Sequence, residues 1–213
     1  MSALTPWLTL VVLGAYHGAN PAMGWLFAVS RGLQERDGRQ VALALPPIAA
    51  GHAASVAATL ALLALGNAIW SSAHLRIAMA VLLIGFGISR LIRPRHPRWV
   101  GMRLGPRDLA LWSFIMATAH GAGLMLLPVF LLSAGSADCG MCQRHAGLLL
   151  GSWQGYAAAV LVHTGSMFAV AASIAAVVYT RWGLGLLRRT WFNLDLLWSL
   201  ALLGSGAAAL WLS

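Results

Sequence analysis

The sequence is poor in charged residues of both signs. Only 9% of its 213 residues are charged, against roughly 25% in a soluble domain. Hydrophobic residues make up 60% of the chain, which predicts an integral membrane protein. All 14 basic residues are arginine and none is lysine. The net charge of +9 does not indicate nucleic acid as a partner, because the arginines lie in short segments between apolar runs, where they set membrane topology.

Acidic residues and cysteine are scarce as well. There are five acidic residues, and Asp195 is the only one within a predicted span. The two cysteines, Cys139 and Cys142, form one C-x-x-C motif, so no second pair completes a Cys₄ zinc site. No basic segment precedes the first apolar run, and this run is as long as a full span. We therefore expect no cleavable signal peptide.

Six apolar runs approach the length of about 20 residues that a bilayer-spanning helix needs. They are Leu8–Val29, Val41–Leu65, Leu75–Leu91, Leu109–Ser133, Leu148–Tyr179 and Trp191–Leu212. The expected fold is an all-α bundle of six transmembrane helices. It forms one polytopic domain, 1–213, with the lipid bilayer as its surroundings and a bacterial inner membrane as its location. The sequence leaves the oligomeric state open.

The loops fix the expected orientation. Three alternate loops carry twelve arginines: Arg31, Arg36, Arg39, Arg90, Arg93, Arg95, Arg98, Arg103, Arg107, Arg181, Arg188 and Arg189. Only Arg76 and Arg144 lie on the other side. The positive-inside rule places the twelve in the cytoplasm and both termini outside.

Three short motifs occur twice in the same order. They are His-Gly-Ala at 17–19 and 120–122, His-x-x-Ser at 52–55 and 163–166, and Gly-x-Gly at 85–87 and 204–206. Because the first three spans begin outside and the last three begin inside, the halves 5–93 and 108–213 would have opposite topology. An inverted 3+3 repeat of this kind is typical of secondary transporters, whose sites lie near the membrane midplane.

Four of the seven histidines fall at one predicted depth. His17, His52, His120 and His163 lie 13 to 18 residues from the nearest cytoplasmic arginine, which is about 20 to 27 Å along a helix. Ionisable side chains near the bilayer centre are functional candidates. The alternative for each histidine is a hydrogen bond to a neighbouring helix.

Other residues beside these histidines fit a site. Asn20, Ser55 and Ser166 each lie three residues from a histidine, on the same helix face. Glycines and prolines should interrupt the spans and free backbone groups toward a protein interior or a wet cavity. We expect such breaks around Pro21 in the first span, at Pro46 and Pro47 where the second begins, and around Gly121 and Pro128 in the fourth.

Imidazole is a good ligand for Zn, Ni, Co, Cu or Fe, whereas hard cations prefer carboxylates. No carboxylate lies in the histidine layer, so Ca²⁺ and Mg²⁺ are poor candidates. Two other uses of the histidines stay open: pairs could ligate b-type haem, or the rings could relay protons.

The outward loop between the fourth and fifth spans has four potential soft-metal ligands: Asp138, Cys139, Cys142 and His145. In an oxidising compartment the two cysteines could instead form a disulfide or a redox-active thiol pair. A loop without chemistry is the third alternative.

With six spans and histidines in spans 1, 2, 4 and 5, the chain resembles the LysE-type superfamily. That superfamily includes small-solute exporters, nickel/cobalt permeases of the NicO kind and HupE/UreJ-like proteins. The resemblance implies a permease or exporter for a small solute. The aspartate-histidine pair of nickel permeases is absent beside His17, and the span cysteines of DsbD/CcdA-type electron carriers are replaced by His17 and His120. The alternative is a redox membrane protein, a b-type cytochrome or thiol-disulfide carrier. We expect a transporter, with a transition-metal ion as its cargo, rather than an enzyme.

Overall fold

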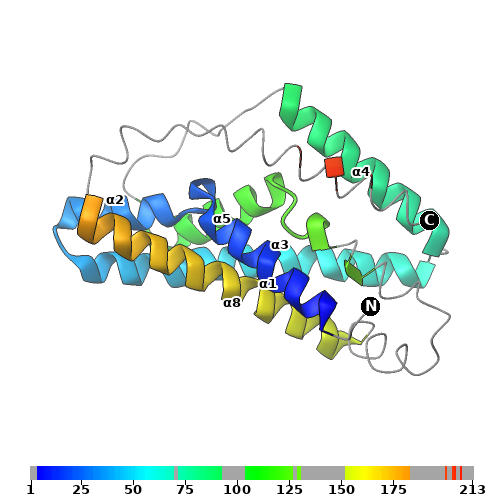
Figure 1. The fold of residues 1–213 in the computed structure, drawn as a ribbon, viewed down its shortest axis with the longest axis horizontal. Helices are drawn as coiled ribbons and strands as arrows, with labels where there is room; N and C mark the ends of the chain where they lie inside the picture. The colour runs from blue at the N-terminus through cyan, green and yellow to red at the C-terminus, as the bar shows by residue number, and fades with distance from the viewer. Residues whose placement is uncertain are drawn as a thin grey trace.

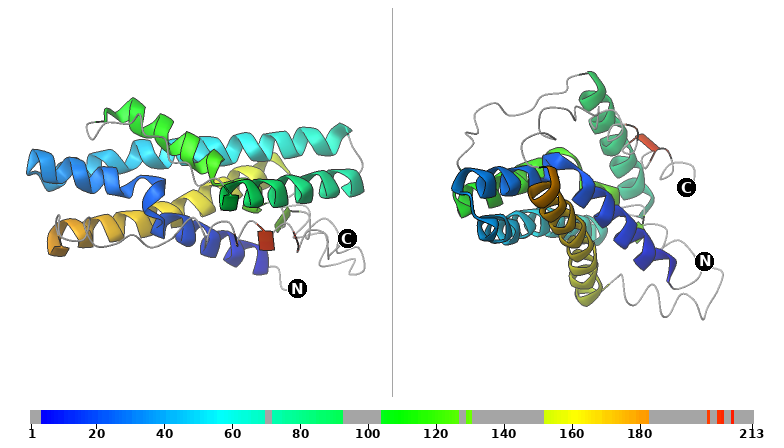
Figure 2. Two further views of the ribbon diagram at one scale, coloured as in Figure 1. Left: turned by 90° about the horizontal axis from the view of Figure 1, so that it is seen from above. Right: turned by 60° about the vertical axis from the view of Figure 1, so that its left-hand side comes forward.

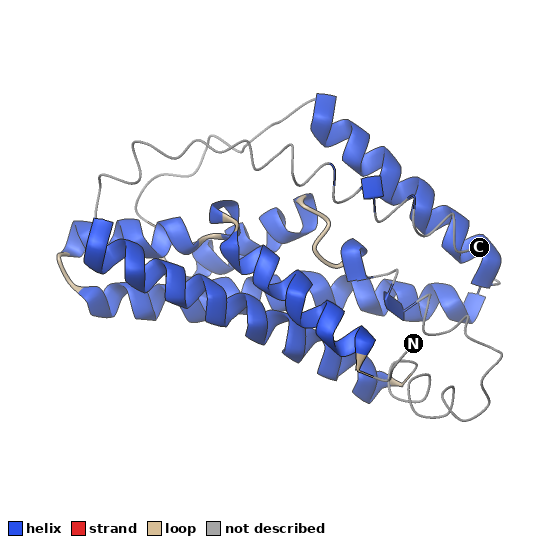
Figure 3. Ribbon diagram, in the orientation of Figure 1, coloured by secondary structure: helices blue, strands red, loops and turns tan. Residues whose placement is uncertain are grey.

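The computed structural model describes residues 4–69, 72–92, 104–126, 129–130 and 152–182, with 200, 203–204 and 207. Within these residues the regular secondary structure is all helical and no strand occurs (Figure 3). The elements are α1 (Thr5–Ala19), η1 (Pro21–Met23), α2 (Trp25–Glu35), α3 (Gly38–Ile69), α4 (Ser72–Ile92), α5 (Pro106–Ala119), η2 (Leu124–Leu126), α8 (Trp153–Val177) and η3 (Val178–Trp182). The all-α prediction is confirmed for this part of the chain.

Two stretches of helix are long and apolar enough to cross a membrane by length and composition, Gly38–Gly66 and Trp153–Arg181. α4 contains a shorter apolar stretch, Ala80–Ser89. The predicted first and fourth spans do not form single long helices, because each is interrupted, and most of the predicted sixth span lies outside the described residues. The two long helices support association with a membrane, while the count of six spans stays a prediction.

Large apolar side chains cover much of the outer surface of the described helices. More than half of each of these side chains is exposed: Leu8, Val12, Leu62, Leu65, Val81 and Leu161. Soluble monomers rarely expose large continuous apolar patches. An outer surface of this kind fits lipid better than water.

The first helix breaks where the sequence predicts it. α1 ends at Ala19, and Asn20 begins η1 by accepting a hydrogen bond from the Ala22 N–H at its Oδ1, 2.9 Å away. Pro21 follows and has no N–H to continue the α-helix. Gly24 has a φ of 115°, which favours glycine, and α2 begins directly after it. The chain therefore bends just beyond His17.

The fourth predicted span is interrupted in a different way. α5 ends at Ala119, and His120 itself is its C-terminal capping residue. Gly121 then takes a φ of 67°, the left-handed conformation that commonly ends helices. A short turn leads from there into η2. Pro128, the other residue expected to break this span, lies outside the described residues.

The predicted break at Pro46 and Pro47 is wrong. Both prolines lie inside α3, which continues from Gly38 to Ile69. Prolines remove backbone hydrogen bonds to the preceding turn, yet membrane helices tolerate them where packing fixes the backbone. Here the neighbouring side chains Leu45 and Ile48 are buried in an apolar cluster, which holds this turn in place.

The core is built from two pairs of helices, and the two helices of each pair run in the same direction (Figures 1 and 2). α1 packs along α8, and α3 packs along α5. In the first pair, a Cβ on Gly14 would meet the backbone oxygen of His163, and a Cβ on Gly18 would meet that of Met167. The contacts advance in the same direction on both helices, so α1 and α8 run parallel.

The second pair has the same polarity. A Cβ on Gly51 of α3 would meet the backbone of Ala110 near the start of α5. One turn further along α3, the Ser55 hydroxyl lies 2.9 Å from the Thr118 hydroxyl near the end of α5. Small residues allow such close backbone approach in membrane helix packing. Parallel pairing of α1 with α8, and of α3 with α5, agrees with the alternating topology predicted from the arginines.

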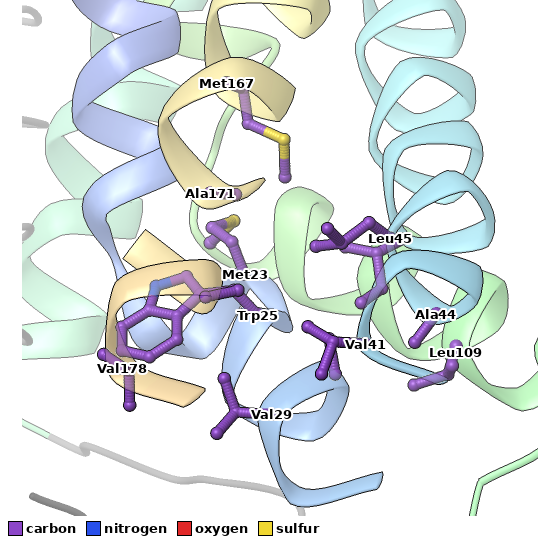
Figure 4. Close-up of a cluster of buried hydrophobic side chains, with 13 residues drawn as sticks. Met23, Trp25, Val29, Val41, Ala44, Leu45, Leu109, Met167, Ala171 and Val178 are labelled. Carbon is purple, nitrogen blue, oxygen red and sulfur yellow. The ribbon is translucent and has the colours of Figure 1, made fainter. Parts of the chain in front are cut away.

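Two buried apolar clusters lie along these pairs. The leucine-rich cluster contains Leu10, Val56, Leu60, Leu63, Ala117, Ala122, Leu126, Val129, Phe130 and Ala159. The methionine cluster, part of which is labelled in Figure 4, contains Met23, Trp25, Ala28, Val29, Val41, Ala44, Leu45, Ile48, Leu109, Met167, Ala171, Ala175 and Val178. On α3 and α8, the histidine of the predicted layer lies between residues of one cluster and residues of the other.

Candidate functional site: a buried histidine cluster

Three of the four predicted histidines meet inside the bundle. His17 comes from the last turn of α1, His52 from the middle of α3 and His163 from α8. Their ring centroids are 5.4 Å apart for His17 and His52, 5.0 Å for His17 and His163, and 5.4 Å for His52 and His163. All three side chains are 0% exposed. The predicted layer therefore brings side chains from three separate helices into direct contact.

His120, the fourth member, is equally buried, at 1% exposure. It lies at the C-terminal end of α5, at the break. With α1 and α8 in one helix pair and α3 and α5 in the other, each pair contributes two of these histidines. We call His17, His52, His120 and His163 the histidine cluster.

Backbone carbonyls orient two of these rings in the same way. The Nδ1–H of His17 donates to the Leu13 oxygen at 2.7 Å, and that of His120 donates to the Met116 oxygen at 2.8 Å. A carbonyl can only accept, so Nδ1 carries the hydrogen and the neutral ring has its lone pair on Nε2. Both bonds reach back four residues along the same helix. His17 and His120, the histidines of the two His-Gly-Ala motifs, therefore have the same tautomer.

His163 is oriented across the helix pair. Its Nδ1–H donates to the Leu10 oxygen of α1 at 3.3 Å. This leaves Nε2 with the lone pair, as in His17 and His120. Histidines that bind metals commonly donate their second nitrogen to a carbonyl or carboxylate, which fixes the tautomer and the ring orientation. The arrangement of these three rings matches that pattern.

Several nitrogens of the cluster have no hydrogen-bond partner. They are the Nε2 of His163 and both ring nitrogens of His52. A buried polar group left unsatisfied costs about 1–3 kcal/mol. Such groups are rare in native proteins and each needs an explanation. A ligand that accepts electron pairs from imidazole would satisfy the Nε2 of His163 and one nitrogen of His52, while the N–H of His52 would need an acceptor.

The predicted secondary contacts are engaged with protein. The Ser166 hydroxyl donates to the Val11 oxygen at 2.7 Å and links α8 to α1. Ser55 links α3 to α5 through Thr118, and the Asn20 side chain caps η1. These three residues hold the backbone that carries the histidines. Their contact with a solute stays a prediction.

Thr118 was missed by the sequence reasoning. Its hydroxyl donates to the Phe114 oxygen at 2.8 Å, so it accepts from Ser55. The available signal was its position two residues before His120, at the depth of Ser55 in the partner helix. Depth alone does not show which helices are neighbours, so the sequence does not predict the contact between Ser55 and Thr118.

The described residues include no group of three His, Cys, Asp or Glu side chains placed to hold one metal ion. His52 and His163 stack with an interplanar angle of 17°, so they present ring faces to each other. His17 meets both edge-on, at 68° and 73°. Coordination of an ion would require these rings to turn so that their Nε2 atoms converge.

Asp138, Cys139, Cys142 and His145, the candidate ligands or disulfide of the outward loop, lie outside the described residues. The alternatives given for this loop remain predictions.

Comparison of the chain with protein-family models, with curated proteins and with solved structures finds no match. The resemblance to LysE-type permeases therefore stays at the level of the predicted architecture.

Proposed function

We propose that the protein is a membrane transporter for a transition-metal ion, with the histidine cluster as its binding site. The observation that supports this most directly is the contact of three fully buried imidazoles from α1, α3 and α8. Two of these rings have nitrogens without a hydrogen-bond partner. Neutral imidazole is a ligand for late first-row transition metals, and the buried side chains of the described residues include no carboxylate that would favour a hard cation.

The helix pairs suggest how such a site would open. In transporters built from inverted repeats, alternating access is often described as a rocking of one repeat against the other. Here that motion would separate α1 from α8 and α3 from α5, where backbones meet at Gly14, Gly18 and Gly51. We therefore propose that each pair moves as a unit. The histidine cluster then lies where the two units meet, and the breaks beyond His17 and at His120 allow the helix ends to follow.

Haem fits this cluster poorly. Two axial histidines bind iron from opposite faces of a porphyrin, so their rings must be separated by the macrocycle. The three rings in the structure touch one another at centroid distances of 5.0 to 5.4 Å. No porphyrin could lie between any two of them. The geometry thus favours an ion over the b-type cytochrome alternative.

The test is metal transport by purified protein in liposomes that contain a metal-sensitive dye. Zn²⁺, Ni²⁺, Co²⁺ and Cu⁺ are offered separately, and His52→Leu is compared with wild type. His52 donates no hydrogen bond to protein, so the variant removes a ligand without breaking a link between helices. We expect a loss of about tenfold or more in transport rate at low metal concentration.

His74→Leu is the matched control, because His74 lies exposed near the start of α4, away from the cluster. It should transport as wild type does. If wild type moved none of the four metals, or if His52→Leu transported as fast as wild type, the proposed function would be wrong.

A further inference from the structure

Two buried methionines of the methionine cluster follow histidines of the histidine cluster closely along the chain. Met167 follows His163 by four residues on α8, so it occupies the same helix face one turn further on. Met23 lies in η1, directly after the break that follows His17. Their exposures are 1% and 0%. In Figure 4 the Met167 side chain extends from α8 toward α3, and Met23 lies below it.

Packing alone does not require sulfur at these positions. Met23 follows His17 by six residues, as Leu126 follows His120. Met167 follows His163 by four residues, as Val56 follows His52. Leu126 and Val56 are both 0% exposed and fill the leucine-rich cluster. An aliphatic side chain therefore serves at the corresponding places on the other side of the histidines, and the thioethers distinguish the two sides.

Thioether sulfur is a soft ligand that selects Cu⁺ among the biological first-row metals, whereas Zn²⁺ prefers a tetrahedral set of thiolate, imidazole or carboxylate. Imidazole and thioether donors together suit an ion that accepts fewer ligands.

The charge of the site favours a monovalent ion. The buried polar side chains of the described residues are histidine, asparagine and serine, with no aspartate or glutamate among them. Nothing in this set would neutralise a cation. Because the Born cost of moving an ion out of water grows with the square of its charge, a divalent ion meets a penalty about four times that of a monovalent ion of equal size.

We propose that Met23 and Met167 form a thioether relay between the histidine cluster and the α2 end of the bundle, and that the cargo is Cu⁺. The inference rests on the proposed transport function and specifies its substrate. The ion passes between the Nε2 atoms of the histidine cluster and the two sulfurs on its way along the interior. Ag⁺ has the same charge and ligand preference, so it is carried as well.

Substitution of both methionines by leucine tests this relay, since leucine keeps nearly the same volume and apolar character. Wild type, Met23→Leu/Met167→Leu and the two single variants are reconstituted in liposomes, and uptake is measured with Ag⁺, which needs no reductant, and with Zn²⁺. We expect the double variant to lose about tenfold in Ag⁺ uptake. The single variants replace it if the double variant does not assemble.

Met125→Leu is the matched control. Met125 is 4% exposed and packs against Leu83 in a separate cluster, apart from the methionine cluster. It should leave Ag⁺ uptake within about twofold of wild type, because no ligand is lost. Melting temperatures of all variants in detergent should agree with wild type within a few degrees.

The outcomes separate the relay from the transport proposal. Ag⁺ uptake that the methionine variants leave unchanged would show that the two side chains serve packing only. Uptake of Zn²⁺, Ni²⁺ or Co²⁺ without Ag⁺, still dependent on His52, would overturn the Cu⁺ assignment and leave the transporter in place. Absence of uptake for every metal would overturn both.

Discussion

The two helix pairs contribute equally to the histidine cluster but are joined in different ways. In the α1–α8 pair the polar links run from side chain to backbone: Ser166 donates to the Val11 oxygen, and His163 donates to the Leu10 oxygen. In the α3–α5 pair the described link joins two side chains, Ser55 and Thr118. The interface between α1 and α8 therefore includes the hydrogen bond that orients the His163 ring. The hydrogen bond between α3 and α5 involves no histidine ring.

Because of this difference, the orientation of a histidine ring depends on helix packing in the α1–α8 pair but not in the α3–α5 pair. Moving α1 relative to α8 displaces the carbonyl that fixes His163. Moving α3 relative to α5 breaks a hydroxyl link but leaves both nitrogens of His52 as they were, because neither has a hydrogen bond to lose. Variants of the two pairs can separate stability from metal binding.

The largest effect is expected from Gly14→Ala, compared with Gly51→Ala. In each variant the new Cβ meets a backbone carbonyl, of His163 or of Ala110, which cannot move aside without its helix. The helices must separate, at a cost of about 3 kcal/mol or more. Both variants should lower the melting temperature strongly, but only Gly14→Ala should also weaken metal affinity in the protein that still folds.

Gly165→Ala on α8 is the control, since nothing lies within 4 Å of a Cβ there. Alanine at that position should leave the protein unchanged or stabilise it by up to about 1 kcal/mol, through its helix propensity. Thermal unfolding in detergent and metal titration give both quantities. Equal loss of affinity in Gly14→Ala and Gly51→Ala would contradict the one-sided coupling.

A smaller effect on stability, but a large one on metal affinity, is expected from His17→Ala and His120→Ala. The two rings share one tautomer and one type of carbonyl bond, and they belong to opposite pairs. Each variant should lose about tenfold or more in metal affinity. The double variant should lose little beyond either single variant, because residues that act as a unit are not additive.

Titration of each purified variant with the transported metal measures these affinities directly. The structural alternative makes a different prediction: both variants would bind as wild type does and differ only in melting temperature. A loss in His17→Ala without one in His120→Ala would restrict the site to the three rings that are in described contact.

The common depth of the histidines and the break near Pro21 could be predicted from the sequence. The contacts between helices could not, for a physical reason. Distance from the boundary arginines gave a common depth for four histidines, and proline, glycine and asparagine marked the break near Pro21. Depth is set by rise per residue, which is constant along a helix. The rotation of each helix and its choice of neighbour depend on packing between distant segments. For this reason the Leu10–His163 and Ser55–Thr118 contacts were not foreseen.

The prolines of α3 show a second limit. Pro46 and Pro47 were expected to break the helix, as Pro21 does, because each lacks an N–H. The outcome differs since Pro21 is followed by Gly24 in a left-handed conformation, while Ile48 and its neighbours are held in the methionine cluster. A proline ends a helix only where the surrounding packing permits the chain to turn.

The smallest effects should come from Ser166→Ala and Ser55→Ala, which act on different helix pairs. Each variant removes one hydrogen bond between helices, worth about 1 kcal/mol. Val11 keeps its carbonyl bond within α1, and the Thr118 hydroxyl keeps its bond to the Phe114 oxygen, so no new buried group is left unsatisfied. The two variants should therefore lower the free energy of unfolding by similar amounts.

Only Ser166→Ala should shift metal affinity, by about two- to fivefold, because loosening α1 from α8 also loosens the Leu10 carbonyl that orients His163. Parallel titrations of both variants decide the matter, and a larger shift in Ser55→Ala would place the coupling in the α3–α5 pair instead.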